Sequence, residues 1–461
     1  MQMLLLAALL AAAPGDKAPA QKSAAADSTK AFPFPTEQHT LDNGLRVVLV
    51  PYDSPGLAAY YTLMRVGSRN EVEQGRSGFA HFFEHMMFRG TKAHPSEDYN
   101  ATVTKLGLNT NAFTSSDHTV YHLYGPSKAL PTIIEYEADR FQNLSYDEPA
   151  FRTEAGAIRG EYDKSHSNPE QQLYESLLDT AFSKHTYKHT TIGFEKDILD
   201  MPTGYEYSKE FFRRYYTPDN AVIVVVGDFD RAKTFDQIKS AYSTWKGKLD
   251  AVAVPKEPKQ AASRRKEVAW PNPTLPRLCV SWHTPAAADI KGSAQQMVLS
   301  AYLFGPTSPL YQSMVLGKQY VDSMFPLFDT PPRDPSLFGT LMRVKDPKRL
   351  KAIESAVLHD IKNLAGGRVD AKRMDSVRSN LKYSNIMSLE TPKDIAVTLA
   401  VLTSPTGDVD YFNKLYAEID KVKPQDLAAF ARANFQDKNR TTIVLQTSKA
   451  KASKATAGGA K

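Results

Sequence analysis

Residues 78–87, GFAHFFEHMM, form the stretch from which the fold and the chemistry of the chain can be predicted. On a helix, His81 and His85 lie about 6 Å apart along the axis and about 40° apart around it, so both imidazoles can reach one metal ion. Glu84 lies on the same face, where its carboxylate can act as general base toward a water molecule that the metal activates. H-x-x-E-H is the inverted form of the zincin motif. The alternative, a helix whose polar residues merely face solvent, is disfavoured by the apolar residues that flank them.

A catalytic zinc ion needs a third protein ligand if its fourth position is to hold water. His118 and His122 are four residues apart in a predicted strand, about 13 Å from each other, and are expected on the surface or in a groove. A predicted helix further along the chain carries Glu154 and Glu161, seven residues apart and therefore on one face. One of the two could bind the metal while the other orients a histidine. Helix geometry alone leaves the choice open.

Hydrophobic patterning predicts an α+β protein with two similar halves. In the first half we expect strands at 45–50, 59–66, 111–123 and 221–226 and helices at 78–87, 131–143, 149–164 and 205–216; in the second, strands at 277–282 and 337–344 and helices at 295–303, 348–364 and 371–388. The ends of the two halves align without gaps at a constant offset, which places Phe211 on Phe430 and Asn220 on Asn439. This faint repeat predicts two tandem domains.

Composition suggests the domain boundaries. Residues 1–20 are expected to be a signal peptide, because the apolar run at 4–13 is too short to span a bilayer and an A-x-A-like cleavage site follows it. The following segments are then a flexible linker (21–34), a zinc-binding domain (35–248), a linker rich in Lys and Pro (249–269), a second domain without a metal site (270–446) and a disordered Lys-rich tail (447–461). We therefore expect a periplasmic or secreted protein without stable membrane insertion.

Charge and cysteine content exclude several classes of protein. The formal charge is +6, but four lysines lie in the tail, so the remainder is close to neutral and no nucleic-acid partner is expected. Cys279 is the only cysteine. It can form no disulfide within the chain, and it excludes zinc ribbons and iron–sulfur centres that need several thiolates.

The motif continues on both sides into a pattern that resembles the insulinase/pitrilysin-like zinc peptidases, in the branch that includes mitochondrial processing peptidase. The matching segments are 67–71 (GSRNE), 81–91 (HFFEHMMFRGT), 111–114 (NAFT), Glu154, Glu161, 216–220 (YTPDN) and 227–228 (GD). The resemblance covers almost all of the chain after the signal peptide. It implies two tandem homologous domains with the LuxS/MPP-like metallohydrolase fold, each a mostly antiparallel sheet covered by helices.

The resemblance also implies roles for individual residues. One Zn²⁺ per chain would be bound by His81, His85 and Glu161, with Glu154 supporting a histidine and Glu84 acting as general base. The implied activity is that of a bacterial zinc metalloendopeptidase acting on peptides or unfolded polypeptide segments. An extended substrate would add to a sheet edge formed by Asn111, Ala112, Phe113 and Thr114, and backbone hydrogen bonds would make that site tolerant of sequence.

One segment of the second half departs from the family pattern. Active members draw on an Arg and a Tyr seven residues apart in a second domain, and Val315 and Asp322 occupy those positions here. Tyr320 is close, but no arginine lies near it in the sequence. We therefore expect a homologous companion chain to supply the pair in a heterodimer, with a homodimer as the alternative assembly. The alternatives are a non-catalytic assembly or binding subunit, which the intact Glu84 disfavours, and a zinc hydrolase for a non-peptide substrate, which would have a small closed pocket.

Overall fold

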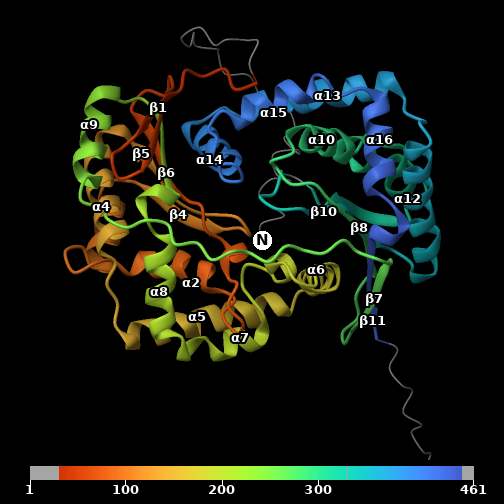
Figure 1. The fold of residues 1–461 in the computed structure, drawn as a ribbon, viewed down its shortest axis with the longest axis horizontal. Coiled ribbons are helices and arrows are strands. Elements are labelled where there is room, and N and C mark those ends of the chain that lie inside the picture. Colours follow the sequence, from red (N-terminus) through yellow and green to blue (C-terminus); the bar gives the residue numbers. More distant parts are fainter. Residues whose placement is uncertain (1–30, 329, 449–461) are drawn as a thin grey trace, which may run out of the picture.

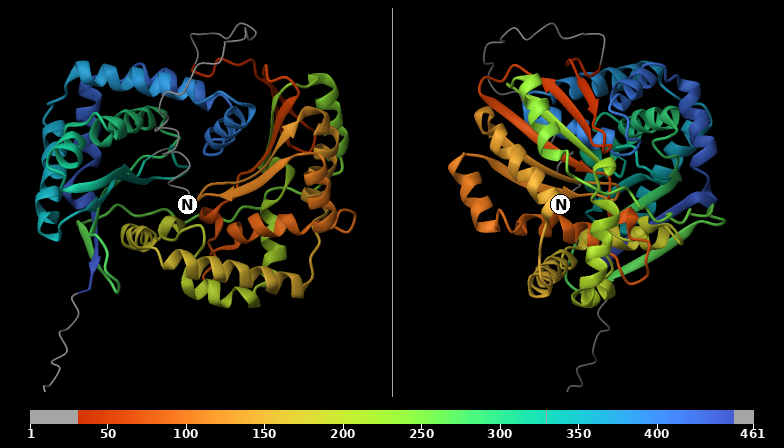
Figure 2. Two further views of the ribbon diagram at one scale, coloured as in Figure 1. Left: turned by 180° about the vertical axis from the view of Figure 1, so that it is seen from behind. Right: turned by 60° about the vertical axis from the view of Figure 1, so that its left-hand side comes forward.

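The computed structural model describes residues 31–328 and 330–448 (Figure 1). The expected signal peptide, the start of the following linker and the tail from residue 449 onward lie outside the described residues. Each half of the described chain contains one sheet, and helices cover the two sheets on their outer sides (Figures 1 and 2). Within these residues, no helix is long and apolar enough to cross a membrane.

The first sheet has six strands in the order β1-β2-β6-β3-β5-β4. Its strands are β1 (Glu37–Thr40), β2 (Arg46–Pro51), β3 (Leu57–Met64), β4 (Asn109–Thr114), β5 (Thr119–Pro126) and β6 (Ala221–Gly227). Only β2 and β6 pair in parallel. The helices of this half are α2 (Phe79–Met86), α3 (Ser96–Lys105), α4 (Leu130–Asn143), α5 (Glu148–His166), α6 (Pro169–Ala181), α7 (Glu195–Asp200), α8 (Tyr205–Tyr215) and α9 (Arg231–Tyr242).

The second sheet has five strands in the order β7-β11-β8-β10-β9, and only β7 and β11 pair in parallel. Its strands are β7 (Arg264–Trp270), β8 (Arg277–Thr284), β9 (Val321–Pro326), β10 (Ser336–Val344) and β11 (Arg440–Thr447). The helices of this half are α10 (Ile290–Phe304), α11 (Pro309–Tyr311), α12 (Leu350–Ala365), α13 (Ala371–Met387), α14 (Pro392–Thr403), α15 (Tyr411–Ile419) and α16 (Pro424–Asn434).

The two halves repeat one topology. Helix α8 begins at Tyr205 and strand β6 at Ala221, and their counterparts α16 and β11 begin at Pro424 and Arg440, with the same spacing between helix and strand. In their respective sheets, β6 and β11 each lie between one parallel and one antiparallel neighbouring strand. The prediction of two tandem α+β domains with mostly antiparallel sheets is therefore confirmed.

Each sheet is covered on its second face by a helix from the other half. Helix α14 packs on β3 and β6 of the first sheet, and Ile395 and Leu399 lie in one buried cluster with Leu63 and Val224. Helix α6 packs on β7, β8 and β11 of the second sheet, where Leu173 joins a separate buried cluster. Because both faces of each sheet are covered, central strands such as β6 are buried along their whole length. The two halves therefore stabilise each other.

Charged side chains reinforce the contact between the halves. The guanidinium of Arg65 donates to the carbonyl of Ser404 at 2.9 Å, just beyond the C-terminus of α14, where a cation is favourable. Burial and neighbouring arginines lower the pKa of Arg65 to about 10. Asp334 of the second half binds both Arg69 and His185 of the first half. These contacts fix the second half against the segment that follows β3 and the loop that follows α6.

Three local predictions differ from the structure. The expected strand at 111–123 is a hairpin, β4 and β5, because the Ser115 hydroxyl accepts the backbone N–H groups of Asp117 and His118 and turns the chain. His118 and His122, expected on the surface or in a groove, are buried, and His122 stacks on Tyr61 at 4.9 Å. The segment 249–269, expected to be a linker, ends inside β7, which pairs in parallel with β11.

Candidate active site

Helix α2 is held rigidly at its N-terminus. The Glu71 carboxylate accepts hydrogen bonds from the backbone N–H groups of Gly78 and Ala80, both at 2.7 Å, and so satisfies donors that the first turn leaves free. Gly78 has φ +94, and a Cβ there would lie 2.7 Å from the Ile198 side chain, so this position requires glycine. The apolar residues of α2 are buried, while His81, Glu84 and His85 remain partly exposed. The helix therefore presents all three polar residues on one side.

His81, His85 and Glu161 come together although Glu161 belongs to a different helix, α5. The His81 Nε2 atom lies 3.4 Å from Glu161 Oε2, and the His85 Nε2 atom lies 3.6 Å from Glu161 Oε1. Ligands of a tetrahedral zinc ion at about 2.0–2.2 Å from the metal stand about 3.4 Å from each other. The three residues therefore fit zinc. No other group of three His, Cys, Asp or Glu side chains within residues 31–328 and 330–448 offers such a cluster.

Glu154 fixes the orientation of one histidine. Its Oε1 atom lies 2.9 Å from His85 Nδ1, and its Oε2 atom accepts a hydrogen bond from Arg89 Nε at 2.6 Å. A proton on His85 Nδ1 directed at Glu154 leaves the Nε2 lone pair pointing toward Glu161. Burial raises the pKa of Glu154, but its hydrogen bonds with His85 and Arg89 outweigh burial, so the pKa is lowered overall. The supporting carboxylate is therefore ionised at neutral pH.

Burial keeps the His81 ring neutral. Burial, together with a smaller effect of the neighbouring His85, lowers the pKa of His81 to about 3. Its Nδ1 atom is buried without a hydrogen-bond partner among the described residues, whereas its Nε2 atom faces Glu161. For His85, burial also lowers the pKa, but the hydrogen bond with Glu154 and the nearby carboxylates outweigh it and raise the pKa overall. A neutral imidazole is the form that binds a metal.

Glu84 lies beside this cluster and is held by strand β4. Its Oε2 atom accepts a hydrogen bond from the Thr114 hydroxyl at 2.6 Å. Burial raises the pKa of Glu84, and the hydrogen bonds with Thr114 oppose that change. A carboxylate with a raised pKa next to a metal site is suited to taking up and returning a proton.

The four residues predicted to contact substrate lie on an edge strand. Strand β4 pairs only with β5 and has no strand on its other side among the described residues. Asn111 is exposed, Ala112 and Thr114 are buried, and Phe113 is partly buried. The outer edge of β4 thus has the arrangement required for adding an extended peptide. The hydroxyl of Thr114 is already engaged with Glu84.

In the second half, the structure adds one contact, between Tyr320 and Arg349, that the sequence did not predict. Val315 lies in a π-helical turn (Gln312–Gly317), and Asp322, in β9, accepts a hydrogen bond from Arg343 Nε at 2.5 Å. An arginine does lie near Tyr320, because the Arg349 guanidinium covers its ring at 4.5 Å. No sequence signal links two residues so far apart in this way. Arg89 lies within the segment 81–91, but its position in the sequence did not predict its contact with Glu154.

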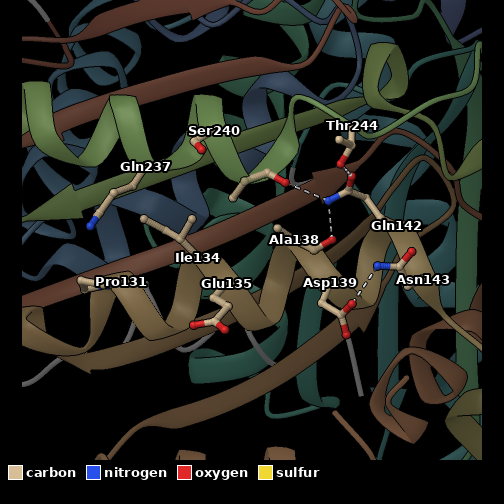
Figure 3. Close-up of a pocket in the computed structure, with 11 residues that line it drawn as sticks. Pro131, Ile134, Glu135, Ala138, Asp139, Gln142, Asn143, Gln237, Ser240 and Thr244 are labelled. Carbon is tan, nitrogen blue, oxygen red and sulfur yellow. Dashed lines mark hydrogen bonds between the residues drawn. The ribbon is translucent and has the colours of Figure 1, made fainter. Parts of the chain in front are cut away.

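Two surface cavities lie away from the three candidate ligands. One, of about 450 Å³, lies between α4 and α9 and is lined by Ile134, Ala138 and Gln142 among others (Figure 3). The other, of about 320 Å³, lies beside the end of α5 and includes Tyr162, His166 and Glu175. Neither is lined by His81, His85 or Glu161, so neither is a small closed pocket around the candidate metal site.

Comparisons with known proteins agree with the fold. A model described as Insulinase (Peptidase family M16) matches residues 47–194, and one described as Peptidase M16 inactive domain matches residues 204–381. The chain is 30% identical over 419 residues to "Zinc protease PqqE" of Helicobacter pylori, covering 89% of this chain and 92% of that protein. It is 29% identical over 218 residues to the beta subunit of mitochondrial-processing peptidase of Bos taurus, which is 46% of this chain and 43% of that protein.

The fold of this chain is also found in solved structures. A crystal structure of a protease from Helicobacter pylori matches 90% of this chain and 100% of its own, with a TM-score of 0.82 and 29% identity. The fold and these relatives define a metallopeptidase built from two tandem halves. The chain belongs to the insulinase family, peptidase family M16.

Proposed function

We propose that this chain is a zinc-dependent endopeptidase that hydrolyses peptides or unfolded polypeptide segments, with one zinc ion per chain. The observation that supports this most directly is the cluster of His81, His85 and Glu161 at distances that fit zinc, with Glu84 beside it. The relative named a zinc protease supports the same reaction class. The inverted H-x-x-E-H motif then supplies two ligands and the general base from a single short helix.

The reaction follows from the positions of these side chains. A zinc ion held by the three ligands would lower the pKa of a water molecule and polarise the scissile carbonyl. Glu84 accepts the proton of the attacking water at its carboxylate and returns it to the leaving amine. Glu154 and Arg89 keep His85 in the orientation that binds the metal. The free edge of β4 holds the substrate backbone in an extended conformation.

We further propose that a homologous partner of different sequence completes the enzyme in a heterodimer, and that the protein is exported to the periplasm or secreted. Val315 and Asp322 occupy the positions where the family pattern has its Arg and Tyr, which supports a partner. The relative from Bos taurus is itself named as a subunit. The export signal rests on the sequence of residues 1–20.

Glu84→Gln tests the proposed mechanism. The variant should bind zinc as the unsubstituted chain does and lose about 10²- to 10⁴-fold in peptide cleavage, because a general base contributes that much. Zinc content by elemental analysis and cleavage of a quenched-fluorescence peptide mixture measure the two effects. Glu135→Gln, at an exposed glutamate of α4, is the matched control and should change neither. Cleavage by Glu84→Gln at the unsubstituted rate would reject the mechanism.

The same assay tests the partner. The purified chain alone should cleave slowly, and adding the co-purifying homologous chain should restore turnover. Full turnover by the chain alone would exclude a required partner of different sequence. A zinc-loaded chain that cleaves nothing in either condition would instead support a non-catalytic subunit.

A further inference from the structure

We propose that Thr114 is a positioning residue for the general base: its hydroxyl holds the Glu84 carboxylate in place for proton transfer and does not contact the side chains of the substrate. This inference rests on the proposed peptidase function. It adds a role for the side chain of Thr114 to the backbone role in substrate binding that the sequence pattern suggested.

The hydroxyl of Thr114 is committed to Glu84. It donates to Glu84 Oε2 at 2.6 Å, and the Thr114 residue is 4% exposed, so no substrate side chain can reach it without displacing its neighbours. The Thr119 hydroxyl lies 3.5 Å away and donates to the Val66 carbonyl at 2.9 Å. A threonine hydroxyl has a single proton to donate. That of Thr114 therefore points at the carboxylate.

This contact has a consequence for catalysis. Hydrogen bonding at Oε2 limits rotation of the Glu84 side chain and leaves Oε1 to exchange a proton with the attacking water. Because Thr114 ends the edge strand whose backbone would hold the substrate, one rigid strand positions both the peptide and the base. A displacement of about 1 Å in such a constellation can cost about 10²-fold in rate.

Strand β4 contains its own control residue. Thr110 is on the same strand, four residues before Thr114 and therefore on the same face. Its hydroxyl lies 3.3 Å from that of Tyr99, a neutral group away from the candidate ligands. Replacing Thr110 by valine removes a hydroxyl from the same strand without touching Glu84.

Kinetics of three zinc-loaded variants test the inference. Thr114→Val, which keeps the shape and removes the hydroxyl, should lower kcat by about 10- to 100-fold and leave KM within about twofold, since only the transition state is affected. Thr114→Ser keeps the hydroxyl and should stay within about threefold of the unsubstituted kcat. Thr110→Val should change neither constant. A rise in KM at constant kcat for Thr114→Val, or a Thr114→Ser variant as slow as Thr114→Val, would overturn the inference.

A second measurement does not depend on activity. Thr114→Val should lower the Tm of the zinc-loaded chain, because it leaves a half-buried carboxylate oxygen without its hydroxyl donor. In a Glu84→Ala background the same substitution should cause a clearly smaller shift, since the contact is already lost. Equal shifts in both backgrounds would refute the Thr114–Glu84 contact. If the unsubstituted zinc-loaded chain cleaves no peptide either alone or with its partner, the proposed function fails, and the Tm comparison still decides the contact.

Discussion

Removing Glu154 is predicted to weaken zinc binding while leaving the two helices folded. The Glu154 side chain is 5% exposed and receives hydrogen bonds from His85 Nδ1 at 2.9 Å and Arg89 Nε at 2.6 Å. In Glu154→Ala the His85 ring loses the acceptor that selects its tautomer and its orientation, so its Nε2 atom faces the metal only part of the time. Loss of such a supporting partner costs about 10- to 100-fold in metal affinity, or about 1.4–2.7 kcal/mol.

Competition for zinc with a chromophoric chelator at neutral pH measures this loss, and circular dichroism checks that the helices remain. Glu148→Ala is the matched control, because Glu148 lies on the same helix and forms an exposed pair with Arg152. Such a pair contributes about 0.5 kcal/mol or less to stability, and its removal should not change the affinity for zinc. The reasoning is refuted if Glu154→Ala binds zinc as tightly as the unsubstituted chain, or if Glu148→Ala loses as much.

Two further predictions concern the contact between the halves. Asp334→Asn should lower the free energy of unfolding by about 1–3 kcal/mol at pH 7, because the carboxylate binds His185 and Arg69. Burial raises the pKa of Asp334, but hydrogen bonds with these two residues outweigh it and hold the pKa well below its ordinary value. The difference in free energy of unfolding between the variant and the unsubstituted chain should thus be complete above about pH 4 and shrink as the pH falls further. Urea unfolding at pH 7 and pH 3.5 measures this difference. A difference that does not change with pH would contradict the prediction. Leu399→Ala should lower the free energy of unfolding by about 2–5 kcal/mol, because it leaves a cavity between α14 and the first sheet. The control, Lys393→Ala on the exposed side of α14, should change it by less than about 0.5 kcal/mol. Equal losses in the two variants would show that α14 does not hold the halves together.

Local spacing was sufficient for much of the candidate site. His81, Glu84 and His85 share one face because the helical period is a property of the backbone and does not depend on the rest of the fold. The repeat of α8 and β6 in α16 and β11 was likewise visible, since the offset between matching residues is constant. The choice between Glu154 and Glu161 as ligand was not settled by spacing: it came from the family resemblance, and in the structure Glu161 lies near both histidines while Glu154 binds His85 Nδ1.

Contacts between distant segments could not be predicted from local spacing. Thr114 meets Glu84 from another element of the fold, and Arg349 covers Tyr320 from beyond two intervening strands, and neither contact leaves a periodic signal in the sequence. The buried position of His122 likewise involves a distant segment, because its ring stacks on Tyr61 of β3.

The sequence alone predicted the residues that share a helix face, because helix geometry is local. It also predicted the repeat of the two halves, because matching residues lie at a constant offset. The packing of α14 on the first sheet and of α6 on the second could be learned only from the folded chain. An apolar helix face must be buried, and the hydrophobic effect that buries it has no direction, so the pattern cannot say against which surface it packs. The position of Glu161 beside the two histidines, and the hold of Thr114 on Glu84, were decided in the same way by how the segments pack.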